Sequence, residues 1–166
     1  AVLAENAQLV RLVEALAGRR VRLSERIVYS NSPGGGAVFH HDAEPEQQGV
    51  VYGQYAGATA WLALPKRELA RLVAEAAKGT RLARRLSSAA RALAALEDEG
   101  AADLARLLNE TPSFTRRLVE GGHALVLRAG DALLLPNHGP DDTCWHSVFA
   151  LGARPSLSHS YGIYPA

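Results

Sequence analysis

The order of its local sequence patterns is the feature that most restricts the fold of this chain. Short apolar runs rich in Val, Leu, Ala and Tyr, separated by turn residues, occupy residues 21–64 and again residues 123–164, and such runs are typical of β-strands. Between them, residues 66–120 carry leucines at helical spacing. The second set of four short strands has too few residues to pair well alone, so we predict that it completes a pair of sheets with the first set.

A further helix is predicted at the start of the chain. Apolar residues recur at helical spacing over residues 2–17, and Gly18 suits the position that follows a helix. The predicted fold class is therefore mainly β with a helical insert: a double-stranded β-helix, with helices at the N-terminus and between the fourth and fifth strands. We expect a single domain over residues 1–166, with the insert at about 66–120. The chain opens at Ala1 and contains no methionine, so we expect that an upstream part is missing.

Net charge and hydropathy argue against several classes of partner. The 166-residue chain has a formal net charge of +1, which provides no general electrostatic attraction to nucleic acid or to a membrane surface. Its apolar runs are short and interrupted, so we expect no membrane-spanning segment. Cys144 is the single cysteine, which rules out an internal disulfide and favours a cytoplasmic location.

Polar side chains interrupt one of the predicted strands, at residues 37–42. Side chains alternate across a strand, which predicts two faces: Val38, His40 and Asp42 on one, and Ala37, Phe39 and His41 on the other. His40 and Asp42 therefore point to one spot, and a distant histidine, for which His146 is favoured, completes a set of three ligands. Two imidazoles and one carboxylate on one side of a metal ion form the ligand pattern of non-haem Fe(II) oxygenases.

Other interpretations of these residues remain open. Without a ligand role, His40 would be a surface histidine and Asp42 a turn residue, although two polar side chains on an inward strand face would be costly to bury. A frame of His41, Asp42 and Ala43 would match the halogenase pattern, in which chloride replaces the carboxylate, but it leaves Asp42 without a role. His138, in a Gly-Pro-Asp loop, is the alternative distant ligand.

Several stretches of the β-framework match one known family. They are the strand with His40-x-Asp42, the hairpin over residues 52–59, the Gly130-Asp131 turn with the strand that follows it, and Trp145-His146. In these stretches the chain resembles the cupin-type, Jumonji-C-like branch of the Fe(II)/2-oxoglutarate-dependent dioxygenases. The helical insert has no counterpart that we can name.

The resemblance implies a cupin or jelly-roll form of the double-stranded β-helix. It also implies an Fe(II)- and 2-oxoglutarate-dependent oxygenase, most simply a hydroxylase of a small molecule. The iron ligands would be His40, Asp42 and His146, and 2-oxoglutarate would be the cosubstrate.

The far carboxylate of 2-oxoglutarate needs a basic or hydroxyl partner, and here the chain departs from the family pattern. Thr59 stands where members of this branch often place a lysine. We expect Arg154 to bind the carboxylate instead, because a guanidinium binds a carboxylate bidentately. Ser156, Thr59 and Tyr52 would supply hydroxyl groups.

Two other functions fit the same residues. A metal-dependent cupin that does not use 2-oxoglutarate would explain Thr59. A non-enzymatic, ligand-binding barrel would leave the His-x-Asp spacing unexplained. As partners we expect a small-molecule substrate and O₂, no nucleic acid and no membrane, and a homodimer formed through the helical insert. The basic residues of the insert are more simply explained as a solvated helix face than as a binding patch.

Overall fold

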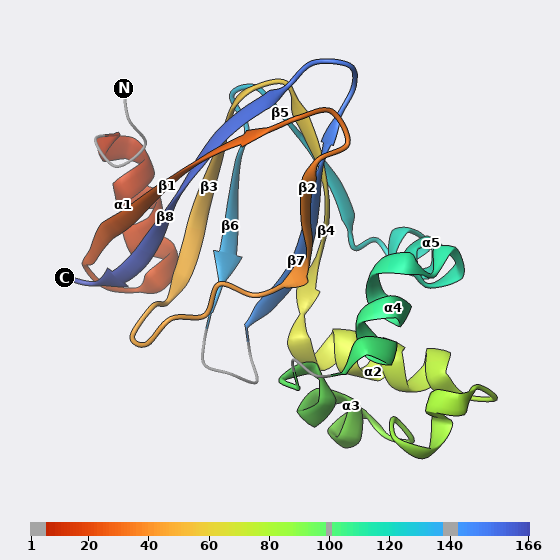
Figure 1. Ribbon diagram of the computed structural model, residues 1–166. Helices are drawn as coiled ribbons and strands as arrows, with labels where there is room; N and C mark the ends of the chain where they lie inside the picture. Colours follow the sequence, from red (N-terminus) through yellow and green to blue (C-terminus); the bar gives the residue numbers. More distant parts are fainter. Residues whose placement is uncertain (1–5, 99–100, 138–142) are drawn as a thin grey trace.

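Two four-stranded antiparallel sheets form the body of the protein in the computed structural model, which describes residues 6–98, 101–137 and 143–166 (Figure 1). The strand order is β1-β8-β3-β6 in the first sheet and β2-β7-β4-β5 in the second. The predicted mainly β architecture with several helices is confirmed. In chain order the strands are β1 (Val21–Asn31), β2 (Gly36–His40), β3 (Gly49–Ala56), β4 (Ala58–Pro65), β5 (Ala124–Arg128), β6 (Ala132–Pro136), β7 (Cys144–Leu151) and β8 (Ser156–Pro165).

The inner faces of the two sheets pack against each other. A buried cluster joins Val50, Tyr52 and Leu135 of the first sheet to Trp61 and Leu127 of the second. The rings of Tyr52 and Trp61 meet edge to face with their centroids 4.6 Å apart, an arrangement that aromatic rings favour. These contacts hold the sheets together at the centre of the sandwich.

Helices pack against part of the outer face of each sheet, on opposite sides of the sandwich (Figure 1). One helix precedes the first strand and ends at Gly18, whose φ of 67° lies in the left-handed region. The others form the predicted insert between the fourth and fifth strands. The helices are α1 (Ala7–Ala17), α2 (Lys66–Ala77), the 3₁₀ helix η2 (Arg81–Arg84), α3 (Ala89–Leu96), α4 (Ala102–Glu110) and α5 (Pro112–Glu120).

The helical insert packs on the second sheet through a core of its own. Leu69, Val73 and Leu118 of the insert are completely buried, and the same cluster contains Leu64 and Trp145 of the sheet. Burial of large apolar side chains stabilises each by about 1.5–3 kcal/mol. The insert is therefore anchored to strands β4 and β7 by apolar contacts.

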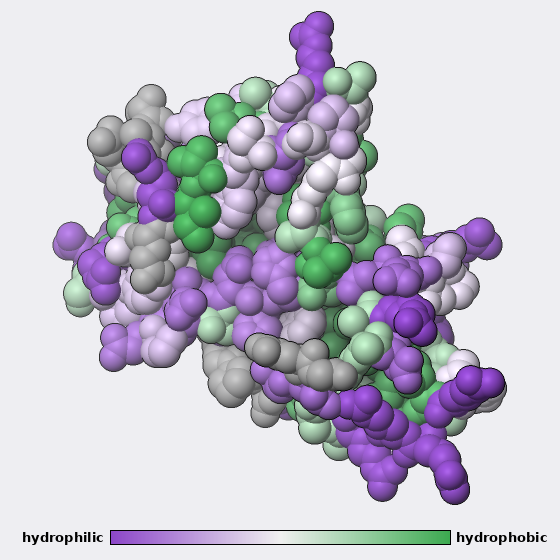
Figure 2. Space-filling model, in the orientation of Figure 1, coloured by the Kyte–Doolittle hydropathy of each residue, from purple (hydrophilic) through white to green (hydrophobic). Residues whose placement is uncertain are grey.

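The surface of the insert is strongly hydrophilic (lower right of Figure 2). Arg71 forms ion pairs with Glu68 and Glu75, and Arg117 pairs with Glu75 as well. The basic side chains alternate with acidic neighbours, which is the pattern of a solvated helix face. None of the helices in the described ranges is long and apolar enough to cross a membrane.

The predicted hairpin over residues 52–59 is wrong. Strands β3 and β4 follow each other with only Gly57 between them, but they belong to different sheets and do not pair. Gly57 has a φ of 71°, and a Cβ there would lie 3.0 Å from the carbonyl oxygen of Pro155. A glycine turn between two apolar strands looks the same in sequence whether the strands pair or cross to opposite sheets.

A substitution at Gly36 tests how closely β2 approaches its neighbour. A Cβ on Gly36 would lie 1.8 Å from the carbonyl oxygen of Val148 in β7, so backbone must move to admit it. We expect Gly36→Ala to lower the free energy of unfolding by about 2 kcal/mol, measured by urea denaturation. Val38→Ala is the control, because the Val38 side chain is largely exposed. Equal stability of Gly36→Ala and the wild type would contradict the close approach.

Candidate metal centre

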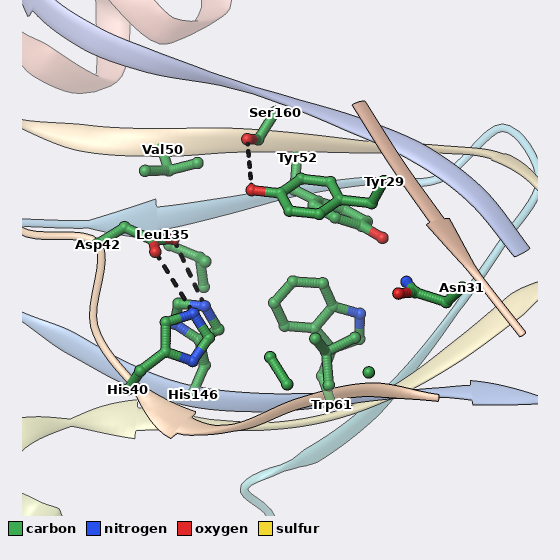
Figure 3. A pocket seen from close by; sticks show the side chains of 13 residues that line it. Tyr29, Asn31, His40, Asp42, Val50, Tyr52, Trp61, Leu135, His146 and Ser160 are labelled. Carbon is green, nitrogen blue, oxygen red and sulfur yellow. Dashed lines mark hydrogen bonds and ion pairs between the residues drawn. The ribbon is translucent and has the colours of Figure 1, made fainter. Parts of the chain in front are cut away.

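Three side chains converge at the edge of the sandwich where β2 ends and β7 begins (Figure 3). Nε2 of His40 lies 3.4 Å from Oδ1 of Asp42, and Nε2 of His146 lies 3.5 Å from Oδ2 of the same carboxylate. The two imidazole rings have their centroids 4.3 Å apart. Within the described part of the chain, these residues form a group whose ligand atoms all lie within 4.8 Å of one another.

Pairing between distant strands brings the group together. His40 is the last residue of β2 and lies directly opposite His146 in β7. Asp42 lies in the loop that follows β2, so the strand is shorter than predicted. The loop turns the carboxylate of Asp42 toward both imidazoles. The predicted approach of Asp42 to His40 is therefore seen, although Asp42 is not part of a strand.

A register shift in β2 changes which of its side chains face the interior. The pairing with β7 shifts between Ala37 and His40. Over this stretch β2 contains one residue more than the part of β7 that it pairs with, as in a β-bulge. Ala37 lines the interior beside His40, whereas Val38 is largely exposed. The predicted faces were therefore wrong for Ala37 and Val38. His41 points away from the group, as predicted, and its ring lies against Trp145 with centroids 5.3 Å apart.

Burial and charge give the three groups different protonation behaviour. Burial lowers the pKa of His146 to about 4, against the attraction of Asp42. The hydrogen bond with Asp42 raises the pKa of His40, which is more exposed. Burial by itself would raise the pKa of Asp42, but the hydrogen bond from His40 and the neighbouring imidazoles lower it overall. At neutral pH, Asp42 is therefore ionised and His146 is neutral, the states that metal ligands require.

A cavity of about 100 Å³ lies between the sheets beside the three residues. Tyr29 projects into it from β1 and forms a hydrogen bond of 3.1 Å with Ser160 of β8. Asn31 and the ring of Trp61 line the far end (Figure 3). A second hollow of about 180 Å³ shares Tyr29, Asp42 and Ser160 with the first. Among the described residues, no lysine or arginine lines either space.

Sequence reasoning did not identify Tyr29, Asn31, Trp61 or Ser160 as residues of this cavity. Strand alternation alone places Tyr29 and Asn31 on one face of β1, but it does not say which face is inward. Pairing of Tyr29 with Ser158 and of Asn31 with Ser156, in register with β8, settles the face.

The residues predicted to bind 2-oxoglutarate lie in different places. Thr59 and Tyr52 are buried in a neutral network: Thr59 and Tyr52 donate to Oε1 of Gln54 at 2.9 and 3.4 Å, and Trp61 donates to Thr59 at 2.9 Å. Ser156 is buried, and Arg154 is exposed outside both cavities. Within the described ranges, the structure therefore brings no lysine or arginine to the hydroxyl-rich interior.

Of the other histidines that the structure describes, His123 and His159 do not join the group. His123 lies beside Glu68, with Nε2 at 4.0 Å from a carboxylate oxygen, on the helical insert side. His159 is buried next to Tyr55 and Tyr161. His138, the alternative distant ligand, lies outside the described residues.

Comparison with known proteins finds similarity to solved structures. No protein-family model matches the chain, and no curated protein matches it. Among solved structures, the chain is similar to a crystal structure of dTDP-4-dehydrorhamnose 3,5-epimerase from Bacillus anthracis with TDP and PPi bound, with a TM-score of 0.44 and 12% sequence identity. The match covers 95% of this chain, which spans 61% of the length of that epimerase.

The predicted membership of the Jumonji-C-like Fe(II)/2-oxoglutarate-dependent dioxygenases is wrong: no family model matches the chain, and the described residues that line the two cavities include no lysine or arginine to bind 2-oxoglutarate. The predicted hydroxylase activity and the predicted cofactors, Fe(II) with 2-oxoglutarate, are wrong with it. The site supplies a physical reason. With Arg154 exposed, the far carboxylate of 2-oxoglutarate would be buried without a cation, at a cost of several kcal/mol.

Proposed function

We propose that the protein is a metal-dependent enzyme of the cupin type that acts on a small molecule without 2-oxoglutarate. The observation that carries the proposal is the convergence of two imidazoles and one carboxylate at the mouth of an interior cavity. The two imidazoles belong to paired strands, and the loop after β2 directs the carboxylate of Asp42 toward both of them. The ligand set, the cavity and the absence of lysine and arginine among the described lining residues fit this function together.

The proposal includes the double-stranded β-helix as the detailed form of the sandwich. Strands β1 to β4 alternate between the first and second sheets, and β5 to β8 alternate in the opposite order. Each strand of the first set thus has neighbours from the second set in its own sheet. This interleaving is what a jelly roll of two antiparallel sheets requires.

The spacing of the donor atoms suits one divalent transition-metal ion. Two ligand atoms about 2.1 Å from one ion in tetrahedral geometry lie roughly 3.4 Å apart. The two nitrogen–oxygen separations that involve Asp42 are 3.4 and 3.5 Å. Imidazole nitrogen and carboxylate oxygen suit ions such as Zn²⁺, Co²⁺ and Ni²⁺, and three protein ligands leave a position for substrate.

The residues around the cavity define what the protein itself contributes to catalysis. A bound metal ion would supply a Lewis acid that polarises an oxygen of the substrate. Tyr29 faces the same space from the opposite sheet (Figure 3). Burial raises its pKa, so the phenol stays protonated at neutral pH and can donate a proton or a hydrogen bond. The arrangement supports isomerisation or hydrolysis of an oxygen-bearing small molecule.

The substrate is uncharged at the end that enters the cavity. That end meets Asn31, Tyr52 and the face of Trp61, which offer hydrogen bonds and apolar surface but no positive charge. A carboxylate buried there without a cationic partner would cost several kcal/mol. The cavity therefore favours hydroxyl, carbonyl or apolar groups at this position.

Titration of the cobalt-loaded protein tests both the metal site and this preference. We expect one equivalent of Co²⁺ to bind. Butyrate should then bind at least tenfold more tightly than succinate, a difference of about 1.4 kcal/mol. Both ligands offer one carboxylate to the metal, and only succinate carries a second charge into the cavity. The visible absorption of Co²⁺ reports both steps.

The two parts of the proposal fail separately. A protein that binds no cobalt lacks the metal site. A cobalt protein that binds succinate as tightly as butyrate has a cationic partner in the cavity, and the assignment of an uncharged substrate end would then be wrong.

A further inference from the structure

The strand that carries His40 lies at the edge of its sheet, so its outer backbone groups have no strand partner. In the order β2-β7-β4-β5, β2 pairs only with β7. The N–H groups on the free side of an edge strand must bind water or another part of the protein. The N–H of Phe39, the residue directly before His40, donates to Oδ1 of Asn109 at 2.9 Å.

Asn109 is held in the orientation that this contact requires. It belongs to α4 of the helical insert, and its Nδ2 donates to the carbonyl oxygen of Ala105, one turn earlier, at 2.9 Å. With the amide nitrogen engaged on its own helix, Oδ1 is directed toward the strand. The side chain of Phe39 is buried in the same core as Leu104 and Leu108 of α4, so backbone and side chain are fixed by one helix.

The residue after His40 is held by the insert as well. Nε2 of His41 lies 3.7 Å from a carboxylate oxygen of Glu97, at the end of α3. The other oxygen of Glu97 contacts Nζ of Lys66, which is buried at the start of α2. The insert therefore contacts the residues directly before and after His40, which are Phe39 and His41.

We propose that Asn109 is a positioning residue for the metal site, acting through the backbone of Phe39 on the direction of His40. This inference rests on the proposed metal-binding function. A site must hold its ligand atoms within about 0.5 Å of the productive geometry. An edge strand that is paired on one side only is held less closely than a strand paired on both sides. The helical insert is thus a support for the metal ligands, built on the outer side of the strand.

Two substitutions at Asn109 and one control separate positioning from packing. Asn109→Ala removes the acceptor, and loss of such an outer contact weakens metal binding by about 10- to 100-fold in other metal sites. We expect at least a tenfold increase in the dissociation constant for Co²⁺ and a changed cobalt absorption spectrum. Asn109→Asp keeps an acceptor oxygen for the N–H of Phe39, so its dissociation constant for Co²⁺ should remain within about threefold of the wild-type value.

Arg106→Ala is the matched control, because Arg106 lies on the same helix, is exposed and forms ion pairs with Asp103 and Glu110 of that helix. It should leave cobalt affinity and spectrum unchanged. Amide hydrogen exchange in the metal-free proteins gives a second readout: Asn109→Ala should speed exchange at Phe39, and Arg106→Ala should not.

Each contrary result overturns a defined statement. Wild-type affinity and spectrum in Asn109→Ala would overturn the positioning role. Equal losses in Asn109→Ala and Asn109→Asp would overturn it in favour of a packing role. If the wild-type protein binds no cobalt, the proposed function fails and the positioning of a metal ligand fails with it. In that case, the exchange measurement still decides whether Asn109 holds the strand.

Discussion

Replacing His146 by alanine is expected to weaken the binding of a divalent metal ion at least 100-fold, a loss of roughly 2.8 kcal/mol. His146 is 3% exposed, and burial lowers its pKa to about 4. The ring is therefore neutral at pH 7 and binds a metal without first releasing a proton. Its removal leaves one imidazole and one carboxylate, which is too few protein ligands for a stable catalytic site. Metal content after dialysis and titration with Co²⁺ measure the loss.

Two further variants make this result specific. His146→Gln keeps more of the buried volume and should lose the metal as well, which separates ligand loss from a cavity in the core. His123→Ala removes a histidine beside Glu68, outside the group of three, and should bind metal as the wild type does. Unchanged metal content in both His146 variants would exclude His146 as a ligand.

The free energy of unfolding of the metal-free protein is expected to fall by about 3 kcal/mol, through His146 alone, as the pH drops from 6.5 to 4. The pKa of His146 is about 4 in the folded protein, below its ordinary value of 6.5. Between these values the unfolded chain binds the proton and the folded chain does not. Stability from the neutral, buried ring is therefore full above pH 6.5 and is lost progressively down to pH 4.

The neighbouring groups titrate mainly outside this window. The raised pKa of His40 stabilises the fold below pH 6.5, and this contribution is lost only as the pH rises through the folded value. The lowered pKa of Asp42 stabilises the fold above its ordinary value of 3.8, and this contribution is lost at more acidic pH. His159 also has a lowered pKa, through burial, so its effect has the same sign as that of His146.

Urea denaturation at several pH values, with chelator present, measures the effect of His146 as a difference between two proteins. The wild type should lose about 3 kcal/mol more than His146→Gln between pH 6.5 and 4, because both retain His159 and the other titrating groups. Equal pH profiles would show that His146 is not buried as a neutral ring.

Local patterns in the sequence determined most of the elements. The apolar runs within residues 21–64 and 123–164 form strands β1–β4 and β5–β8, and the helical spacing within residues 66–120 corresponds to the helices of the insert. Such features depend on neighbours within one or two turns, so periodicity and turn residues are sufficient.

Pairings between distant strands were decided only by the tertiary structure. The crossing at Gly57 and the register shift before His40 depend on which strand lies beside which. These choices place Ala37 inside and Val38 outside, against simple alternation. A one-residue change of register moves a side chain to the other face, and nothing within the strand itself reveals it.

The site shows the same division. The spacing of His40 and Asp42 and the apolar strand around His146 made these residues candidates from the sequence by itself. Their approach to within 4.8 Å follows from the pairing of β2 with β7, which joins positions about a hundred residues apart. The charge of the side chains that line the cavity could not be predicted from local sequence patterns, because these residues come from distant strands. Arg154 was assigned to it from its place in the chain, but a guanidinium is costly to bury without a partner, and the turn before β8 leaves it in solvent.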